Sequence, residues 1–151
     1  MTIPVLQAAK YLAGRSGWEL TPQQMQRILY IANMIHLGDH GSPLVFGFFE
    51  AIRFGPRHPE LEQAVMQYGA GPIRDVAWPT GRVKPGTTER KVLDESYKAL
   101  RKASGGKLVA ITNRKGGAWE TTMERDGNRS PILSDPILAE YKSILKEKAD
   151  E

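Results

Sequence analysis

The chain has 151 residues, of which 40% are hydrophobic and 25% are charged, with no cysteine and a formal net charge of +4. Such a length and composition are ordinary for one globular domain, which can bury a core without covalent staples. The lack of cysteine excludes disulfides, thiolate metal sites and cysteine nucleophiles. We therefore predict a single domain over residues 1–151.

The hydropathy of the chain argues against a membrane protein. No stretch approaches the roughly 18 consecutive apolar residues of a membrane-spanning helix. The N-terminal residues MTIPVLQ contain no basic residue, whereas a signal peptide begins with a positively charged segment. We expect no membrane contact and a cytoplasmic location.

Two helices are predicted at the start of the chain. The apolar residues Val5, Ala8, Ala9 and Leu12 follow the i, i+3, i+4, i+7 spacing of one helix face, and glycines at 14 and 17 end this helix. The second helix has the strongest start signal in the sequence, because Thr21 can cap it, proline follows, and Gln24 can bond back to the cap. A wide apolar stripe then runs to residue 35, and we expect the helix to end near residues 37–38.

Residues 46–54 are short and aromatic, and prolines lie on both sides of them. We predict an extended segment there. In extended chain Phe46, Phe48 and Phe54 share one face, together with residues 50 and 52, while Phe49 and Ala51 share the other. Two interpretations stay open: all four phenylalanines belong to the core, or one face leaves aromatic side chains exposed as a protein-binding surface. An exposed strand edge here would also be able to accept a strand from a partner.

The rest of the chain predicts further helices separated by glycine-rich and proline-rich breaks. We expect mainly α structure, a compact bundle of about six helices with one short extended or hairpin segment. The remaining elements are a helix opened by Pro59, a connector over residues 73–86, a helix capped by Thr87 or Thr88, a break at residues 104–106, a short helix near residues 108–112, a polar stretch at 118–131, and a last helix capped by Asp135. Residues 145–151 are expected to fray.

Basic residues are concentrated in the second half of the chain. Residues 82–115 hold 10 basic and 3 acidic side chains, which is typical of a solvated helix face or of a surface that attracts an acidic partner or nucleic acid. Two helices around the break at 104–106 also resemble a helix-turn-helix, with residues 119–132 as a wing. The second of these helices offers few donors for base edges, namely Lys107, Thr112 and Asn113. A structural helical hairpin is therefore the favoured interpretation.

The sequence contains no recognisable reaction centre. His36 and His40 have the i, i+4 spacing of metal ligands on a helix, but we expect Gly38 between them to unwind the turn, and no third ligand is evident. No nucleophile-elbow or phosphate-binding glycine motif is present. His58, at a helix start, is expected to be a surface or interface group. We predict no catalytic residue, no metal and no cofactor.

Several stretches carry a family resemblance. They are VLQAAKYL at residues 5–12, LTPQQMQRILY at 20–30, and PLV at 43–45 followed by FEAIRFGP at 49–56. In this order and spacing, with weaker matches at 108–119 and 131–141, they resemble the Panacea domain family of phage-associated, SocA-like proteins. The sequence departs from the family pattern at Arg27, Ile52, Asn113 and Ala118, where lysine, tryptophan, histidine and proline are usual.

The resemblance implies an antitoxin that inhibits a cognate protein toxin by direct contact and has no catalytic activity. Inhibition would mask the working surface of the toxin, or would deliver the bound toxin to a cytosolic AAA+ protease, with this chain as adaptor. The alternative, from another class, is a DNA-binding transcriptional regulator that uses the basic residues 82–115.

Two groups of residues are predicted to contact the toxin, one supplying affinity and one steering an acidic partner. The first group is Phe48, Arg53, Arg57 and His58, and the second is Arg82, Lys84, Arg90 and Lys91. Three further residues are predicted to be structural. Tyr30 packs its ring in the core while its hydroxyl finds a buried partner, and Gly55 with Pro56 fixes a sharp exit from the extended segment.

Overall fold

The computed structural model describes residues 2–74 and 76–150. Within them it is mainly α, as predicted, with a small three-stranded sheet. The elements are α1 (Val5–Arg15), α2 (Pro22–His40), β1 (Glu50–Ile52), β2 (Gly55–Arg57), α3 (Pro59–Val65), the 3₁₀-helix η1 (Met66–Tyr68), α4 (Thr88–Leu100), α5 (Gly105–Thr112), α6 (Ala118–Asp126), β3 (Ser130–Pro131) and α7 (Ser134–Ala149). No helix among the described residues has both the length and the hydropathy of a membrane span.

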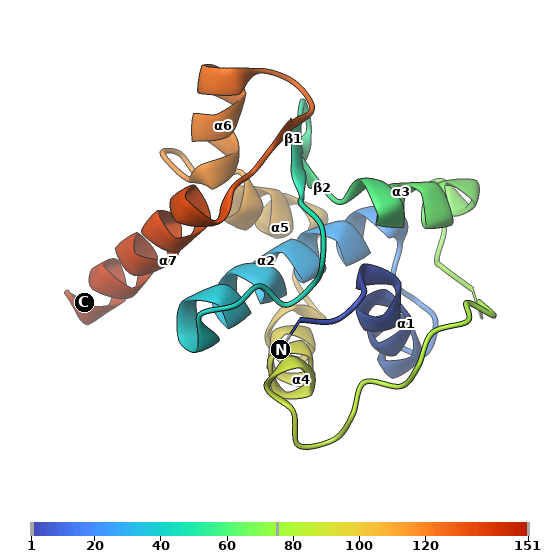
Figure 1. Ribbon diagram of the computed structural model, residues 1–151. Helices are drawn as coiled ribbons and strands as arrows, with labels where there is room; N and C mark the ends of the chain where they lie inside the picture. The colour runs from blue at the N-terminus through green and yellow to red at the C-terminus, as the bar shows by residue number, and fades with distance from the viewer. Residues whose placement is uncertain (1, 75, 151) are drawn as a thin grey trace.

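Helix α2 is the centre of the fold. Figure 1 shows it crossing the middle of the molecule, with α4 below it and the β1–β2 hairpin above it. Twelve of its nineteen residues are buried, because other elements pack on nearly every side. Its start is the predicted capping box, in which Gln24 N–H donates to the Thr21 hydroxyl and the Gln24 side chain accepts from Thr21 N–H.

The predicted end of α2 is two to three residues too early, and the predicted unwinding at Gly38 does not occur. The helix continues to His40 and stops at Gly41, which has a φ of 78°. Gly38 serves packing instead. A Cβ atom there would lie 2.1 Å from the ring of Tyr141, so the glycine allows α7 to approach α2 closely.

Helix α6 was not predicted, and the polar stretch 118–131 is therefore not a DNA-binding wing. Its N-cap residue, Gly117, has no side chain to cap the helix. The cap comes from α7, where Glu140 accepts a 2.8 Å hydrogen bond from Ala118 N–H. Burial raises the pKa of the Glu140 carboxyl. The hydrogen bond from Ala118 and the charge of Arg114 favour the charged form and oppose this rise.

The C-terminal residues extend the last helix. Residues 145–149 belong to α7, and Glu147 forms an ion pair with Arg114, two residues after the end of α5. This pair ties the last two turns of α7 to the body of the molecule.

The sheet is small and has the order β2-β1-β3, with both pairings antiparallel. Gly55 and Pro56 lie inside β2, and the turn is made by residues 53–54, so the predicted sharp exit at Gly55 and Pro56 is wrong. The outer edge of β2 offers little for an added strand. Pro56 has no N–H, and the side-chain amide of Gln26 bonds both N–H and C=O of His58. A partner is therefore expected to meet side chains here rather than a free strand edge.

Candidate functional site: an anchored aromatic loop beside the hairpin

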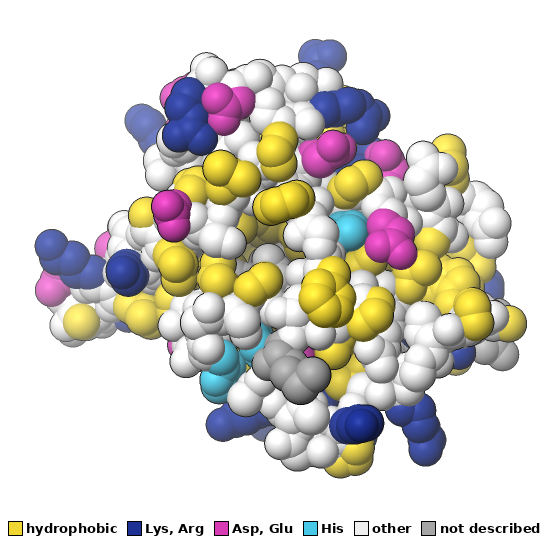
Figure 2. All heavy atoms as spheres, viewed as in Figure 1, with side chains coloured by type: hydrophobic (Ala, Val, Ile, Leu, Met, Phe, Trp, Pro, Cys, Tyr) yellow, Lys and Arg dark blue, Asp and Glu magenta, His cyan; other side chains and the backbone are white. Residues whose placement is uncertain are grey.

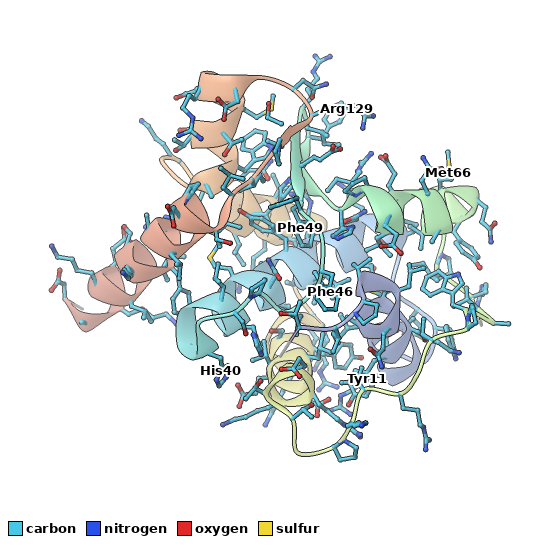
Figure 3. The ribbon with its side chains drawn as sticks, viewed as in Figure 1. Tyr11, His40, Phe46, Phe49, Met66 and Arg129 are labelled. Carbon is cyan, nitrogen blue, oxygen red and sulfur yellow. The ribbon has the colours of Figure 1, made fainter. Side chains whose placement is uncertain are left out.

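The segment between α2 and β1 presents aromatic side chains to solvent. Phe46 is 60% exposed and Phe48 is 57% exposed, whereas Phe49 is 2% exposed and Ala51 is buried. We call residues 42–49 the aromatic loop. Figure 2 shows apolar side chains gathered in the middle of one face, where Figure 3 labels Phe46 in the same view. The interpretation in which all four phenylalanines are core is therefore wrong, and the predicted exposure of aromatic side chains is confirmed.

Buried polar side chains form hydrogen bonds with backbone N–H and C=O groups of the aromatic loop. Asn33 Oδ1 accepts from the N–H groups of Leu44 and Val45, at 2.9 and 3.2 Å. His36 Nδ1 lies 2.6 Å from the carbonyl of Ser42, and His58 Nε2 lies 2.9 Å from the carbonyl of Phe46. Asn33, His36 and His58 are each at most 6% exposed.

The N-terminal segment adds backbone contacts to the same loop. Ile3 pairs with Val45 in a parallel bridge, with hydrogen bonds of 2.9 Å from Ile3 N–H to the Leu44 carbonyl and 3.0 Å from Phe46 N–H to the Ile3 carbonyl. A loop held at so many backbone atoms loses little conformational entropy when a partner covers it, which favours tight binding by exposed aromatic side chains.

A small cavity of about 310 Å³ lies under the exposed rings. Phe46, Phe48 and Phe49 line it from the loop, Asn33 from α2, and Ile132 and Ile137 from the segment around the start of α7. The aromatic loop therefore combines protruding rings with an apolar depression, the arrangement in which interface hot spots concentrate.

His58 is not the surface group that the sequence analysis expected. It is 3% exposed, its ring centre lies 5.3 Å from that of Phe49 with the two ring planes perpendicular, and its Nε2 contacts the Phe46 carbonyl. A Cβ at Gly47 would lie 3.0 Å from His58 Nε2, so this glycine lets the loop close over the imidazole. His58 positions the loop and is not free to contact a partner.

The protonation of His58 makes a testable prediction. Burial lowers the pKa of His58 below its ordinary 6.5, although the Phe46 carbonyl and the charges of Glu60 and Glu50 oppose the shift. Below pH 6.5 the unfolded chain then binds more protons than the folded protein, so the stability that His58 contributes is present above that pH and is lost as the pH falls. Urea unfolding measures the free energy of unfolding at pH 7.5 and at pH 5.5. Between these two values the native protein is expected to lose more of it than the His58→Gln variant does.

His40→Gln, at an exposed histidine of the same protein, is the matched control and is expected to keep the native pH dependence. Equal losses in the native protein and in His58→Gln would contradict the assignment.

The other predicted contact residues divide into two separate regions. Arg53 is exposed at the hairpin turn, with its guanidinium 5.6 Å from the Phe54 ring centre, and Arg57 is half-buried in an ion pair with Glu62. The basic group lies on the connector and on α4, with α2 between it and the hairpin (Figure 1). Arg82, Lys84 and Lys91 are exposed, and Arg90 packs 5.2 Å from the Tyr11 ring centre.

The predicted structural residues are partly as expected. The Tyr30 ring is fully buried, with its centre 5.2 Å from that of Phe49. Its hydroxyl, however, has no hydrogen-bond partner among the described residues, and burial raises its pKa. The predicted buried partner is therefore wrong.

Two side chains that a helix-turn-helix would need are used inside the protein. Thr112 and Asn113, at the end of α5, both accept hydrogen bonds from the Arg27 guanidinium, and Asn113 Nδ2 also donates to the Phe54 carbonyl. The described residues also contain no group of three or more His, Asp or Glu side chains placed to hold a metal ion.

Comparison with known proteins identifies the family of the chain. The family model described as "Antitoxin SocA-like, Panacea domain" matches residues 25–120, which run from the first turn of α2 into α6 and include the aromatic loop and the hairpin. The chain belongs to the Panacea domain family. A curated relative, Antitoxin SocA of Caulobacter vibrioides (strain NA1000 / CB15N), is 28% identical over 112 residues, which cover 68% of this chain and 60% of the relative. No solved structure matches this chain.

Sequence reasoning missed the polar anchors of the loop. Asn33 and His36 stand within the apolar stripe of α2, and His58 follows the hairpin. A polar residue inside an apolar stripe was the available signal, because such a residue must find a buried partner. Its partner is a loop backbone, which no side-chain pattern reveals.

Proposed function

We propose that this Panacea domain protein is an antitoxin that neutralises a cognate toxin by binding it through the aromatic loop, without catalysing a reaction. The observation that carries the proposal is the exposure of Phe46 and Phe48 on a backbone fixed by Asn33, His36 and His58. Rigid, exposed aromatic side chains are the typical anchors of protein interfaces. The family and the SocA relative supply the class of partner, a toxin.

Co-expression with the product of the neighbouring gene tests the proposal. That product is expected to arrest growth alone, to be tolerated together with this chain, and to co-purify with it. The double variant Phe46→Ser/Phe48→Ser is expected to weaken binding at least about 30-fold, since one hot spot contributes about 2 kcal/mol or more. Its melting temperature is expected to change little, because both rings are exposed.

Leu145→Ser is the matched control, since Leu145 is 47% exposed on α7 and lies outside the aromatic loop. It is expected to leave neutralisation intact. Neutralisation by the double phenylalanine variant at the native level, or rescue without physical association, would refute the proposal. Preferential binding to promoter DNA with a steep salt dependence would favour the DNA-binding alternative instead.

The basic group is proposed to steer an acidic toxin toward the aromatic loop. Charge reversal at the exposed Lys84 and Lys91 is then expected to slow association and to weaken its salt dependence, with little effect on dissociation.

The fate of the bound toxin separates masking from delivery to a protease. A toxin half-life unchanged by this chain supports masking, and a half-life shortened only in cells with an active AAA+ protease supports delivery.

A further inference from the structure

A second concave surface lies on the other side of the hairpin from the aromatic loop. This groove, of about 670 Å³, is bounded by the first turn of α2, by β1 and β2, and by α3 with η1. The side chains that matter for its chemistry are Arg27, Phe54, Arg57, Glu62 and Met66. None of the anchors of the aromatic loop lines it.

Two exposed apolar side chains stand on different walls of the groove. Phe54 is 65% exposed on the hairpin turn, and Met66 is 64% exposed on η1. Figure 3 shows Met66 pointing outward at the far end of the α3–η1 segment. Large apolar side chains that protrude beside a groove favour a ligand with apolar groups of its own.

The charge inside the groove is positive. Arg27 is only 4% exposed, and its guanidinium donates to three neutral acceptors: the Thr112 hydroxyl, Asn113 Oδ1 at 3.0 Å and the Phe54 carbonyl at 2.6 Å. Nε of Arg27 is buried without a hydrogen-bond partner, and in the described part of the chain no carboxylate pairs with this guanidinium. Neutral acceptors satisfy its N–H groups but leave its charge uncompensated.

The neighbouring charges do not cancel this one. Burial, and then the charge of Arg57, lower the pKa of Arg27. Among the residues that the structure describes, Glu62 is the one carboxylate that lines the groove, and it is shared between Arg57 and Arg129. Two arginines against one glutamate leave a net positive groove, and the positive end of the α2 helix dipole adds to it.

We infer that the groove binds a segment of a partner protein in which an acidic side chain is flanked by apolar side chains. The carboxylate would face Arg27 and Arg57, and the apolar neighbours would cover Phe54 and Met66. A phosphate-bearing ligand fits less well, because it would leave both apolar walls uncovered. The inference rests on the proposed function only in taking the ligand to be a protein.

The test uses the full-length protein and two short peptides, N-acetyl-Leu-Glu-Leu-amide and its Leu-Gln-Leu counterpart. Nuclear magnetic resonance follows the Arg27 Nε–H and the Met66 methyl group during each titration. The glutamate peptide is expected to shift both signals in a saturable way, and the glutamine peptide is expected to bind at least 10-fold more weakly. Equal binding of both peptides, equal or tighter binding of inorganic phosphate, or no shift with either peptide would overturn the inference.

A charge-matched pair of variants sharpens the test. Because Met66 is exposed, Met66→Glu and Met66→Lys are both expected to fold normally. Both variants remove the apolar wall at Met66, but only Met66→Glu adds a negative charge, so it is expected to weaken binding of the glutamate peptide at least 10-fold more than Met66→Lys does. Equal loss in both variants would show that Met66 acts only through its apolar surface and would refute the charge argument.

The outcome is separable from that of the proposed function. If the protein binds the glutamate peptide but does not neutralise the product of the neighbouring gene, the antitoxin proposal is refuted and the assignment of the groove stands. Neutralisation without any response of the Arg27 and Met66 signals refutes the groove alone.

Discussion

Replacing Gly55 by alanine is expected to lower the free energy of unfolding by about 2–6 kcal/mol, through two independent costs. Gly55 has a φ of 142°, a conformation that alanine adopts only with strain of about 1–3 kcal/mol. A Cβ there would also lie 2.7 Å from Arg27 Nη1 and 2.8 Å from Asn113 Oδ1. Both atoms belong to the hydrogen-bonded cluster that joins the hairpin to α2 and α5, so overpacking adds about 1–3 kcal/mol.

Two other glycines separate these costs. Gly86 has a φ of 79° and open space around it, so Gly86→Ala is expected to show the backbone strain alone. Gly105 lies in the first turn of α5 with a negative φ and no close neighbour, so Gly105→Ala is expected to be neutral or slightly stabilising. Urea unfolding is expected to rank the losses Gly55, Gly86, Gly105. A loss in Gly55→Ala no larger than in Gly86→Ala would show that Arg27 does not restrict this position.

The elements that sequence predicted well are those whose signals are local. The start of α2 is an example, because the cap, the proline and the returning glutamine lie within four residues. Helix α6 is the opposite case, since its cap is a glutamate 22 residues away on α7. The end of α2 was predicted too early for a similar reason. Gly38 predicts a break locally, but this glycine instead leaves space for the ring of Tyr141 on α7.

The aromatic segment shows where alternation of side chains succeeds and where it fails. Phe46 and Phe48 are exposed and Phe49 and Ala51 are buried, as the period of two predicts. Ile52 breaks the pattern, because it was expected on the face of Phe46 but is 8% exposed. Helix α6 packs there, with Trp119 Nε1 donating to the Ile52 carbonyl at 2.7 Å. An unpredicted helix therefore accounts for the buried Ile52.

Replacing His36 by alanine is expected to destabilise the protein by about 2–5 kcal/mol, because it opens a cavity and removes three buried hydrogen-bond contacts. The ring is completely buried, and its Nε2 lies 2.8 Å from the Thr88 hydroxyl and 3.0 Å from Glu89 Oε2. The Thr88 hydroxyl itself donates to Glu89 Oε2 at 2.6 Å. Alanine would therefore remove one of the polar contacts of the Glu89 carboxylate, which belongs to a residue only 4% exposed.

Nδ1 of the same ring connects this pair to the proposed binding surface, because it bonds the carbonyl of Ser42 at the start of the aromatic loop. His36→Ala is thus expected to weaken binding of the toxin as well as folding, whereas Phe46→Ser/Phe48→Ser weakens binding alone. His40→Ala is the control for stability, since this exposed ring lies one helical turn away, 4.9 Å from that of His36, and is expected to matter by less than about 0.5 kcal/mol.

Urea unfolding of His36→Ala, Glu89→Ala and the double variant measures the coupling between the two residues. If the pair acts as one unit, the double variant loses at least 1 kcal/mol less than the sum of the single losses. Additive losses would mean that His36 and Glu89 stabilise the protein separately, and a loss below about 1 kcal/mol in His36→Ala would mean that the start of the aromatic loop does not depend on this imidazole. The second result would remove His36 from the set of anchors and leave Asn33 and His58 to fix the loop.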